Sequence, residues 1–175
     1  ELQALIGFSP LVHDLITGAT TRVSISSSGV AGNSESFSPT MSDDGRIVAF
    51  GTHASNLVPT SGTTVEAVLV HDRQTGITTS GSVASNGTQP NGDSFYPALS
   101  SDGQVLMFMS LATNLVPGDT NSAIDVFVRD RTAQTTSRVS VASDGTQANT
   151  DENSQAPYGD ISSDGWMGTF HSEAS

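Results

Sequence analysis

The chain has 175 residues, the length of one ordinary domain, and its 18 acidic and 6 basic residues give a formal net charge of −12. So acidic a chain repels nucleic-acid phosphates and anionic membrane surfaces, and its apolar runs are far shorter than the roughly 20 residues that span a bilayer. We therefore expect neither nucleic-acid binding nor membrane insertion. The absence of cysteine excludes disulfides and thiolate metal sites.

Strand-like runs, separated by turns, occur in groups along the chain. The groups are residues 9–26 with two runs, 38–84 with four, 96–142 with four, and 157–172 with two. In each complete group the second run, such as 46–50, is the most continuously apolar, which predicts a strand buried on both faces. The fourth run, such as 136–141, alternates, which predicts a half-exposed outer strand.

These groups are copies of one repeat. Asn56-Leu57-Val58-Pro59 recurs at 114–117, and the pattern Ser-x-Asp-Gly at 42–45 recurs at 100–103 and 162–165. The period is about 58 residues, with a short insertion around 150–153 in the third copy. A period of this length with four strands per copy is typical of β-propeller blades.

The turns between the first and second runs carry the strongest local signal. Each contains Asp-Gly between two strand-like runs, and the glycine supplies a positive φ that a tight hairpin requires. We expect short first strands that begin at Pro39 and Pro97, followed by these hairpin turns.

The landmarks also indicate a family. The combination of Pro-x-x-Ser-x-Asp-Gly, an apolar strand, Ala-Ser-Asn-Leu-Val-Pro and a strand ending in Arg-Asp-Arg resembles the TolB-like, WD-like β-propeller repeat of large bacterial secreted and surface proteins. The resemblance covers nearly the whole chain, although residues 1–8 fit poorly. It implies blades of four antiparallel strands and a place outside the cytoplasm, whether extracellular, on the cell surface or periplasmic. It does not specify a function, because propellers of this kind serve many.

The ends of the chain are complementary. Residues 9–26 supply the third and fourth strands of a blade and residues 157–172 supply the first and second, so the chain amounts to three blade equivalents. Propellers typically have four to eight blades. We expect either that the chain is part of a longer protein or that two copies form a two-fold dimer with a ring of six blades.

One loop carries candidate metal ligands. Asp119, Asn121 and Asp125 place three oxygen side chains within seven residues, and Ca²⁺ takes several oxygen ligands at close range. The glycine and distal glutamate of an EF-hand are missing, and an Asx turn that opens a strand explains the same residues. Calcium binding and a plain turn both stay open.

The insertion in the third copy is a second candidate. Asp151, Glu152 and Asn153 add acidic and polar groups to one loop, and loops on one face of a propeller often carry binding. A binding loop and a merely solvated loop are the two readings.

Two further repeat positions invite a structural reading. His13 and His71 are equivalent, and the third copy has Arg129 there, so we expect a packing or hydrogen-bonding role at a strand end. Arg73 and Arg131 each follow the aspartate that ends the third strand, and Arg22 and Arg138 are equivalent in the fourth strand. We expect Arg–Asp pairs across a blade that tie the third strand to the next turn. Exposed pairs of this kind contribute about 0–1 kcal/mol.

The sequence offers no catalytic or cofactor-binding residue, since it has neither a Gly-x-Ser-x-Gly elbow nor a glycine-rich phosphate loop. We therefore expect a non-catalytic binding or scaffolding propeller that presents loops to a protein or a glycan. The alternative is a propeller appendage or fragment of a secreted hydrolase. Carboxylates with raised pKa values in a central cleft would favour the hydrolase.

Overall fold

The computed structural model describes residues 8–59, 65–147 and 159–170. Within these ranges every helix or strand is a β-strand, which confirms the all-β prediction, and none of the described residues forms a helix that could cross a membrane. The strands are β1 (Leu11–His13), β2 (Thr20–Arg22), β3 (Ser36–Met41), β4 (Ile47–Thr52), β5 (Ala67–Asp72), β6 (Ile77–Ser80), β7 (Ser94–Leu99), β8 (Val105–Ser110), β9 (Asp125–Asp130), β10 (Thr135–Arg138), β11 (Gly159–Ile161) and β12 (Gly168–Phe170).

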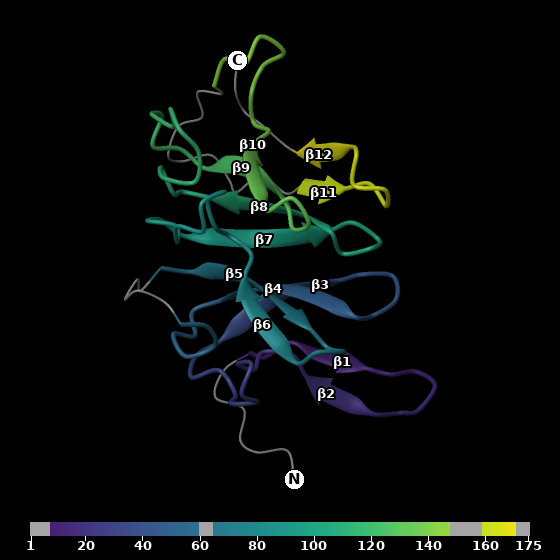
Figure 1. The fold of residues 1–175 in the computed structure, drawn as a ribbon. Helices are drawn as coiled ribbons and strands as arrows, with labels where there is room; N and C mark the ends of the chain where they lie inside the picture. Colours follow the sequence, from purple (N-terminus) through teal and green to yellow (C-terminus); the bar gives the residue numbers. More distant parts are fainter. Residues whose placement is uncertain (1–7, 60–64, 148–158, 171–175) are drawn as a thin grey trace.

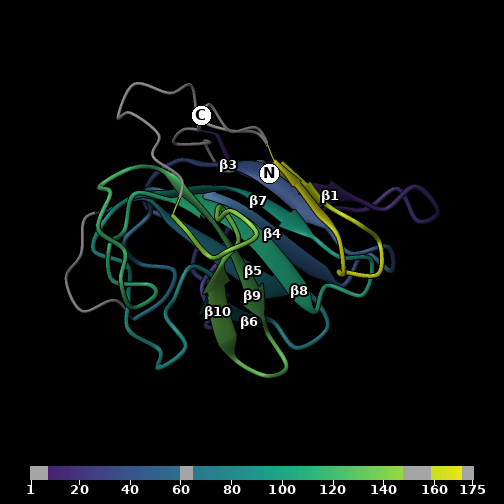
Figure 2. The same cartoon turned by 90° about the horizontal axis from the view of Figure 1, so that it is seen from above.

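The strands form antiparallel sheets that stack in chain order (Figure 1). The two complete sheets have the orders β3-β4-β5-β6 and β7-β8-β9-β10, and we call them the first and second complete blades. The hairpins β1-β2 and β11-β12 lie at opposite ends of the stack (Figure 1). In the view from above, β3 and β7 lie toward one side of the molecule, and β6 and β10 lie toward the other (Figure 2).

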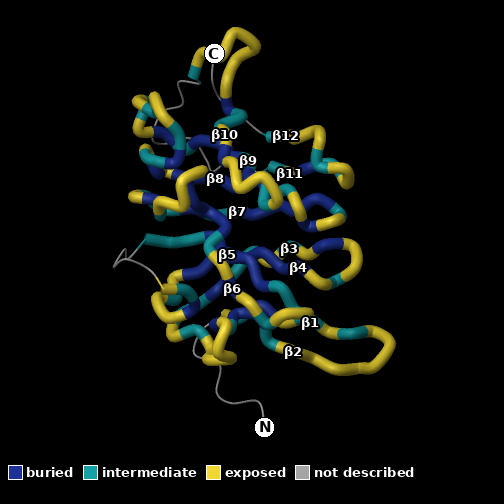
Figure 3. Tube along the Cα trace, in the orientation of Figure 1, coloured by how far each residue is buried: buried dark blue, intermediate teal, exposed yellow. Residues whose placement is uncertain are grey.

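Burial across each blade follows the sequence pattern. All six residues of β4 are buried, and in β8 only the first residue is partly exposed. By contrast, β6 and β10 each bury one residue of four. Figure 3 shows the buried strands inside the stack and the exposed turns at its margins. Both expectations, a buried second strand and a half-exposed fourth strand, are confirmed.

The first strands differ from the prediction because they begin before the prolines. β3 starts at Ser36 and β7 at Ser94, and the register of each shifts around Pro39 or Pro97. Proline has no N–H for the ladder, so the pairing continues past it only through a bulge. The residues before the two prolines, Ser38 and Tyr96, both have φ near 50°.

The core lies between the sheets. One cluster joins β4 and β5 to the second complete blade through Phe108 and Phe127, whose rings stack with centroids 5.7 Å apart. A second joins the first complete blade to Val12 and Val23, and a third joins the second complete blade to Ile161 and Phe170. Each sheet thus buries apolar faces against its neighbours, as repeat architectures require.

Polar contacts with the same period tie each sheet to the next. The Thr78 amide on β6 donates to Ser27 Oγ (3.0 Å), and 58 residues later the Thr136 amide on β10 donates to Ser85 Oγ (2.8 Å). Near the Asp-Gly turns, Asp43 N donates to Ser101 O and Ser101 N donates to Ser163 O, both at 2.9 Å. The blade-to-blade geometry therefore repeats along with the strands.

Candidate functional site

The Ser-x-Asp-Gly turn is a closed hydrogen-bonded unit. Ser42 Oγ donates to Asp44 Oδ1 (2.6 Å) and accepts from the Ile47 amide (2.9 Å), while Asp44 Oδ1 accepts from the Arg46 amide (2.9 Å). These hydrogen bonds hold the pKa of Asp44 below its ordinary value. Gly45 has φ 70°, and it is the turn residue with a positive φ. The predicted hairpins are confirmed, and each turn presents the residue after its glycine to solvent.

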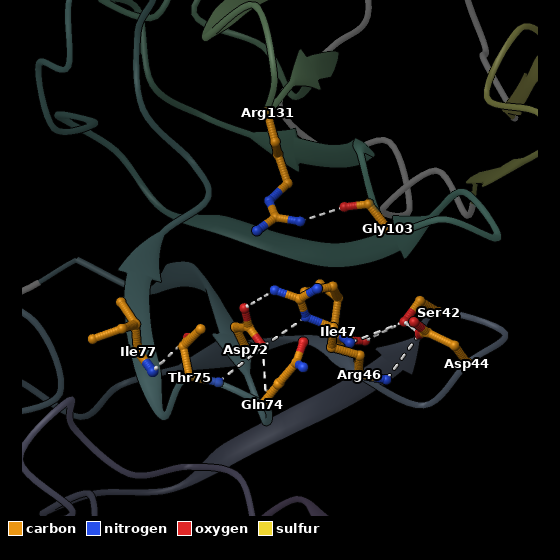
Figure 4. A network of polar contacts seen from close by, with 10 residues as sticks. All are labelled: Ser42, Asp44, Arg46, Ile47, Asp72, Gln74, Thr75, Ile77, Gly103 and Arg131. Carbon is orange, nitrogen blue, oxygen red and sulfur yellow. Dashed lines mark hydrogen bonds and ion pairs between the residues drawn. The ribbon is translucent and has the colours of Figure 1, made fainter.

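The exposed arginine of the first such turn forms a bidentate ion pair. Arg46 Nε lies 3.0 Å from Asp72 Oδ1, and Arg46 Nη2 lies 2.7 Å from Asp72 Oδ2 (Figure 4). The pair lowers the pKa of Asp72 well below its usual range and raises that of Arg46. Asp72 Oδ1 also accepts from the Gln74 and Thr75 amides, so the carboxylate is anchored on its own turn.

The arginines that follow the strand-end aspartates act differently from the prediction. Arg73 Nη1 donates to the Gly45 carbonyl (2.6 Å), and Arg131 Nη1 donates to the Gly103 carbonyl. The expected Arg–Asp pairs are therefore wrong for Arg73 and Arg131, because the glycine carbonyl of the neighbouring turn points at the guanidinium. Arg138 does pair with an aspartate across its blade, since its Nη1 lies 3.3 Å from Asp125 Oδ2. Burial lowers the pKa of Arg131, and the nearby Asp72 carboxylate opposes this.

Two open hollows lie on opposite margins of the stack. Near the turns, a hollow of about 390 Å³ is lined by Asp44, Gly45, Arg46, Arg73 and Gln74. The other margin carries the loop between β4 and β5, and we call it the long-loop margin. It has a hollow of about 490 Å³, which we call the serine hollow and which is lined by Ser26, Ser27, Ser28, Val30 and the segment Asn56–Pro59. The first offers charged groups, and the second offers hydroxyls beside an apolar floor.

The long loops around the serine hollow are held by an asparagine clasp. Asn33 N donates to Asn56 Oδ1 (2.9 Å), Ser55 N donates to Asn33 Oδ1 (2.9 Å), and Asn56 Nδ2 reaches the Ala31 carbonyl (2.9 Å). The next repeat makes the same bonds with Asn91 and Asn114. The asparagine of the Asn-Leu-Val-Pro landmark therefore fixes the long loops, which are positioned by side chains as well as by strands.

The strand-end histidines have the expected hydrogen-bonding role. His13 Nδ1 lies 2.7 Å from Thr20 Oγ1, and His71 Nδ1 lies 2.9 Å from Thr78 Oγ1. In the third copy Arg129 Nη1 donates to Thr136 Oγ1 at 2.9 Å. The position thus bonds one threonine of the neighbouring strand in every repeat.

The candidate calcium loop brings two of its three residues together. Asp119 Oδ1 and Asp125 Oδ2 each lie 3.3 Å from Arg138 Nη1, and Asn121 Oδ1 instead accepts from the Ala123 amide (3.2 Å). All three members of the Asp119–Arg138–Asp125 cluster are largely buried. Burial, and then the charge of Asp125, raises the pKa of Asp119. The guanidinium lies where a cation would bridge the carboxylates, and calcium binding stays a prediction.

The other candidate residues lie elsewhere. Asp151, Glu152 and Asn153 fall outside the described residues. Across residues 8–59, 65–147 and 159–170, no group of three or more His, Cys, Asp or Glu side chains is arranged to hold a metal ion.

A carboxyl that the sequence analysis missed lies between the complete blades. The Glu66 amide donates to Asp93 Oδ1 (2.9 Å), and Glu66 Oε1 is buried without a hydrogen bond among the described residues. Burial, and then the charge of Asp93, raises the pKa of Glu66 to about 7. The available signal was a glutamate at a position where the next repeat has Ile124; nothing local placed Asp93 beside it.

Comparison with known proteins adds fold information. No protein-family model and no curated protein matches the sequence. TolB from Acinetobacter baumannii is similar in structure, with a TM-score of 0.55 and 16% identity over 93% of this chain and 31% of that one. A putative TolB from Agrobacterium tumefaciens gives a TM-score of 0.48, with 15% identity over 74% and 40% of the two chains, and the tricorn protease gives 0.46, with 20% identity over 70% and 12%.

The structural match to TolB from A. baumannii extends over 93% of this chain. The chain spans about a third of that protein's length. Its fold is the TolB-like β-propeller.

Proposed function

We propose that the protein is a non-catalytic propeller module that binds a protein segment outside the cytoplasm through its long-loop margin. The observation that carries this proposal is the serine hollow, whose walls are loops fixed by the asparagine clasp. A site on fixed loops loses little conformational entropy when it binds, which favours affinity.

The chemistry of the hollow supports an extended segment of protein. Ser28 is exposed and places its hydroxyl 2.9 Å from that of Ser26, whereas the Ser27 hydroxyl bonds to the Thr78 backbone. Leu57 and Val58 form a buried to half-buried apolar floor. A strand-like peptide can hydrogen-bond to such hydroxyls with its backbone and place alternate apolar side chains on such a floor. The net charge of −12 favours a basic partner, since long-range attraction raises its rate of encounter.

Selection from a phage-displayed peptide library tests the proposal. We expect enriched peptides that carry Lys or Arg beside an apolar residue and whose binding weakens with salt. The substitution Val30→Arg fills the serine hollow from an exposed lining position and should weaken binding at least about tenfold, a loss of roughly 1.4 kcal/mol. Ile77→Arg, at an exposed position on β6 outside the hollow, is the matched control. Equal effects of the two substitutions would contradict the proposal. So would a selection that enriches no peptide while a parallel glycan array shows binding.

One observation favours the second candidate, an appendage or fragment of a secreted hydrolase. A carboxyl with a pKa near 7, as in Glu66, can donate or accept a proton at neutral pH. Hydrolysis of peptide, ester or glycoside substrates that is abolished by Glu66→Gln and unaffected by Val30→Arg would establish this candidate in place of the binding module.

A further inference from the structure

Two strand edges at opposite ends of the stack have no strand beside them in the described part of the chain. Among the described strands β1 pairs with β2 alone, and β12 pairs with β11 alone (Figure 1). β1 corresponds to the third strand of a complete blade, and β12 corresponds to the second. In both complete blades these two strands pair with each other, as β4 with β5 and β8 with β9. The two edges are therefore of the two kinds that pair with each other in a complete blade.

The repeat fixes how such an interface would be registered. In the first complete blade Val48 pairs with His71, Ala49 with Val70 and Phe50 with Leu69. The equivalent residues lie 58 positions earlier on β1 and, past the insertion, 120 positions later on β12. The matching pairs are Gly168 with His13, Thr169 with Val12, and Phe170 with Leu11.

Side chains near the two free edges have changed together. In the complete blades the three positions around this strand pair are all polar: Arg46, Arg73 and Gln74 in the first blade, and Gln104, Arg131 and Thr132 in the second. In the second blade two of these side chains touch, since Thr132 Oγ1 lies 3.0 Å from Gln104 Oε1, and in the first blade Arg46 pairs with the neighbouring Asp72. At the ends of the chain the same three positions are Trp166, Leu15 and Ile16, which are 85%, 91% and 97% exposed. The apolar residue at one edge and the apolar residues at the other thus occupy positions that lie close together in a complete blade.

A second, separate contact calls for the same hairpin. Ser27 and Ser85 each bond to a threonine on the fourth strand of the following sheet, Thr78 or Thr136. The third equivalent serine, Ser143, has no following sheet of that kind within the described chain, and the third equivalent threonine, Thr20, lies on β2. A β1-β2 hairpin placed against β12 would bring Thr20 to Ser143 by the same repeat geometry.

We propose that a second copy of this chain fills both edges. The β1-β2 hairpin of each copy pairs with β12 of the other in the register given above, and Leu15 and Ile16 of one copy cover Trp166 of its partner. Two equal joints related by a two-fold axis close a ring of six blades, so that association stops at the dimer. The apolar side chains leave water and the open strand edges gain hydrogen bonds, which supplies the driving force.

The solution mass, measured by light scattering after size-exclusion chromatography, is the first test. We expect about 36 kDa, twice the 18.0 kDa of one chain. Trp166→Asp sets a carboxylate against Asp14 of the partner and should weaken the dimer about 100-fold. Trp166→Arg introduces the residue that stands at the equivalent position 46, where it pairs with Asp72. The dissociation constant of this variant's dimer should stay within about tenfold of the parent's and should depend on salt. Circular dichroism on all three proteins shows whether each is folded.

Engineered cysteines test the register, since the chain has none of its own. Val12 and Thr169 correspond to a pair whose Cα atoms would lie about 4.5 Å apart, within disulfide range. Val12→Cys with Thr169→Cys should give a covalent dimer on oxidation, whereas Leu11→Cys with Thr169→Cys, whose side chains point to opposite faces, should not. A folded parent that stays monomeric at 100 µM, assemblies larger than two, equal loss of dimer in Trp166→Asp and Trp166→Arg, or equal cross-linking of both cysteine pairs would each overturn the proposal.

Discussion

The two complete blades share a backbone and differ in the chemistry placed on it. Where β5 begins, the first blade has Ala67, and where β6 ends it has Ser80; the second blade has Asp125 and Arg138 at these positions. The strand registers of the two blades are the same, yet among the described residues only the second carries a buried ion pair. The comparison shows that the repeat sets the scaffold, and that loops and strand ends carry what is specific to each copy.

Breaking the buried cluster gives the largest expected effect. Arg138→Gln leaves the buried carboxylates of Asp119 and Asp125 without their cation and should lower the free energy of unfolding by about 3–5 kcal/mol. Ser80→Ala, at the equivalent position, removes one hydrogen bond to Gln89 and should cost about 1 kcal/mol or less. Urea unfolding measures both. Losses of equal size would show that the cluster is not the feature that separates the blades.

The Asp-Gly turns differ in what lies beside them. Gly103 has φ 67°, and a Cβ there would lie 2.8 Å from the Cβ of Ile47, whereas the nearest atom to a Cβ on Gly45 is 3.6 Å away. Both alanine substitutions should lower the free energy of unfolding by roughly 1–2 kcal/mol because of the positive φ. Gly103→Ala should lower it by about 1–3 kcal/mol more because of overpacking.

Thermal unfolding compares the two turns directly when both substitutions are made in the Trp166→Asp variant. That variant weakens the proposed dimer, so no second copy packs against Gly45. If Gly45→Ala is as costly as Gly103→Ala, the packing of one blade's turn on the next is not what distinguishes them.

Glu66 sharpens the comparison through pH, because the second blade has Ile124 in its place. The folded-state pKa of Glu66 is raised to about 7, so the folded protein holds this proton more tightly than the unfolded chain does. The resulting stabilisation is complete below about pH 4.5 and is lost as the pH rises through 7. Glu66→Gln should therefore be more stable than the parent by about 1 kcal/mol at pH 8, after allowance for solvent screening, and equal to it at pH 4. A gain that is independent of pH would contradict this.

The smallest effect concerns calcium at Asp119 and Asp125. We expect weak uptake by the parent, because Ca²⁺ must displace Arg138 from between the carboxylates. Millimolar calcium should raise the melting temperature by only about 1–2 °C in the parent and by more in Arg138→Gln, in comparison with a chelator. Titration calorimetry without heat in either protein would count against a calcium site.

Much of the fold could be predicted from the sequence because its signals are local and repeated. An uninterrupted apolar run predicted the buried strand β4, and Asp44-Gly45 predicted its hairpin. The start of β3 before Pro39 could not be predicted, because the strand continues through a bulge that depends on pairing with β4.

The candidate site was harder to predict, since its contacts join residues that are not neighbours in the sequence. Asp119 and Asp125 were singled out for their spacing, but Arg138, which lies between them, is on β10, 13 residues beyond Asp125. Glu66 and Asp93 are 27 residues apart and meet only where the two blades pack.

Amide hydrogen exchange at β12 tests the closed ring most directly. The backbone of Ile47 bonds on the β3 side of β4. Because bonding alternates along a strand, the amides of Val48 and Phe50 point at β5. Gly168 and Phe170 are the equivalent residues on β12. In a closed ring the amides of Gly168 and Phe170 are protected in the parent and lose that protection in Trp166→Asp, while Thr169, bonded toward β11, stays protected in both. Rapid exchange of Gly168 and Phe170 in the parent at concentrations that would populate the dimer would contradict a ring closed by two copies of this chain.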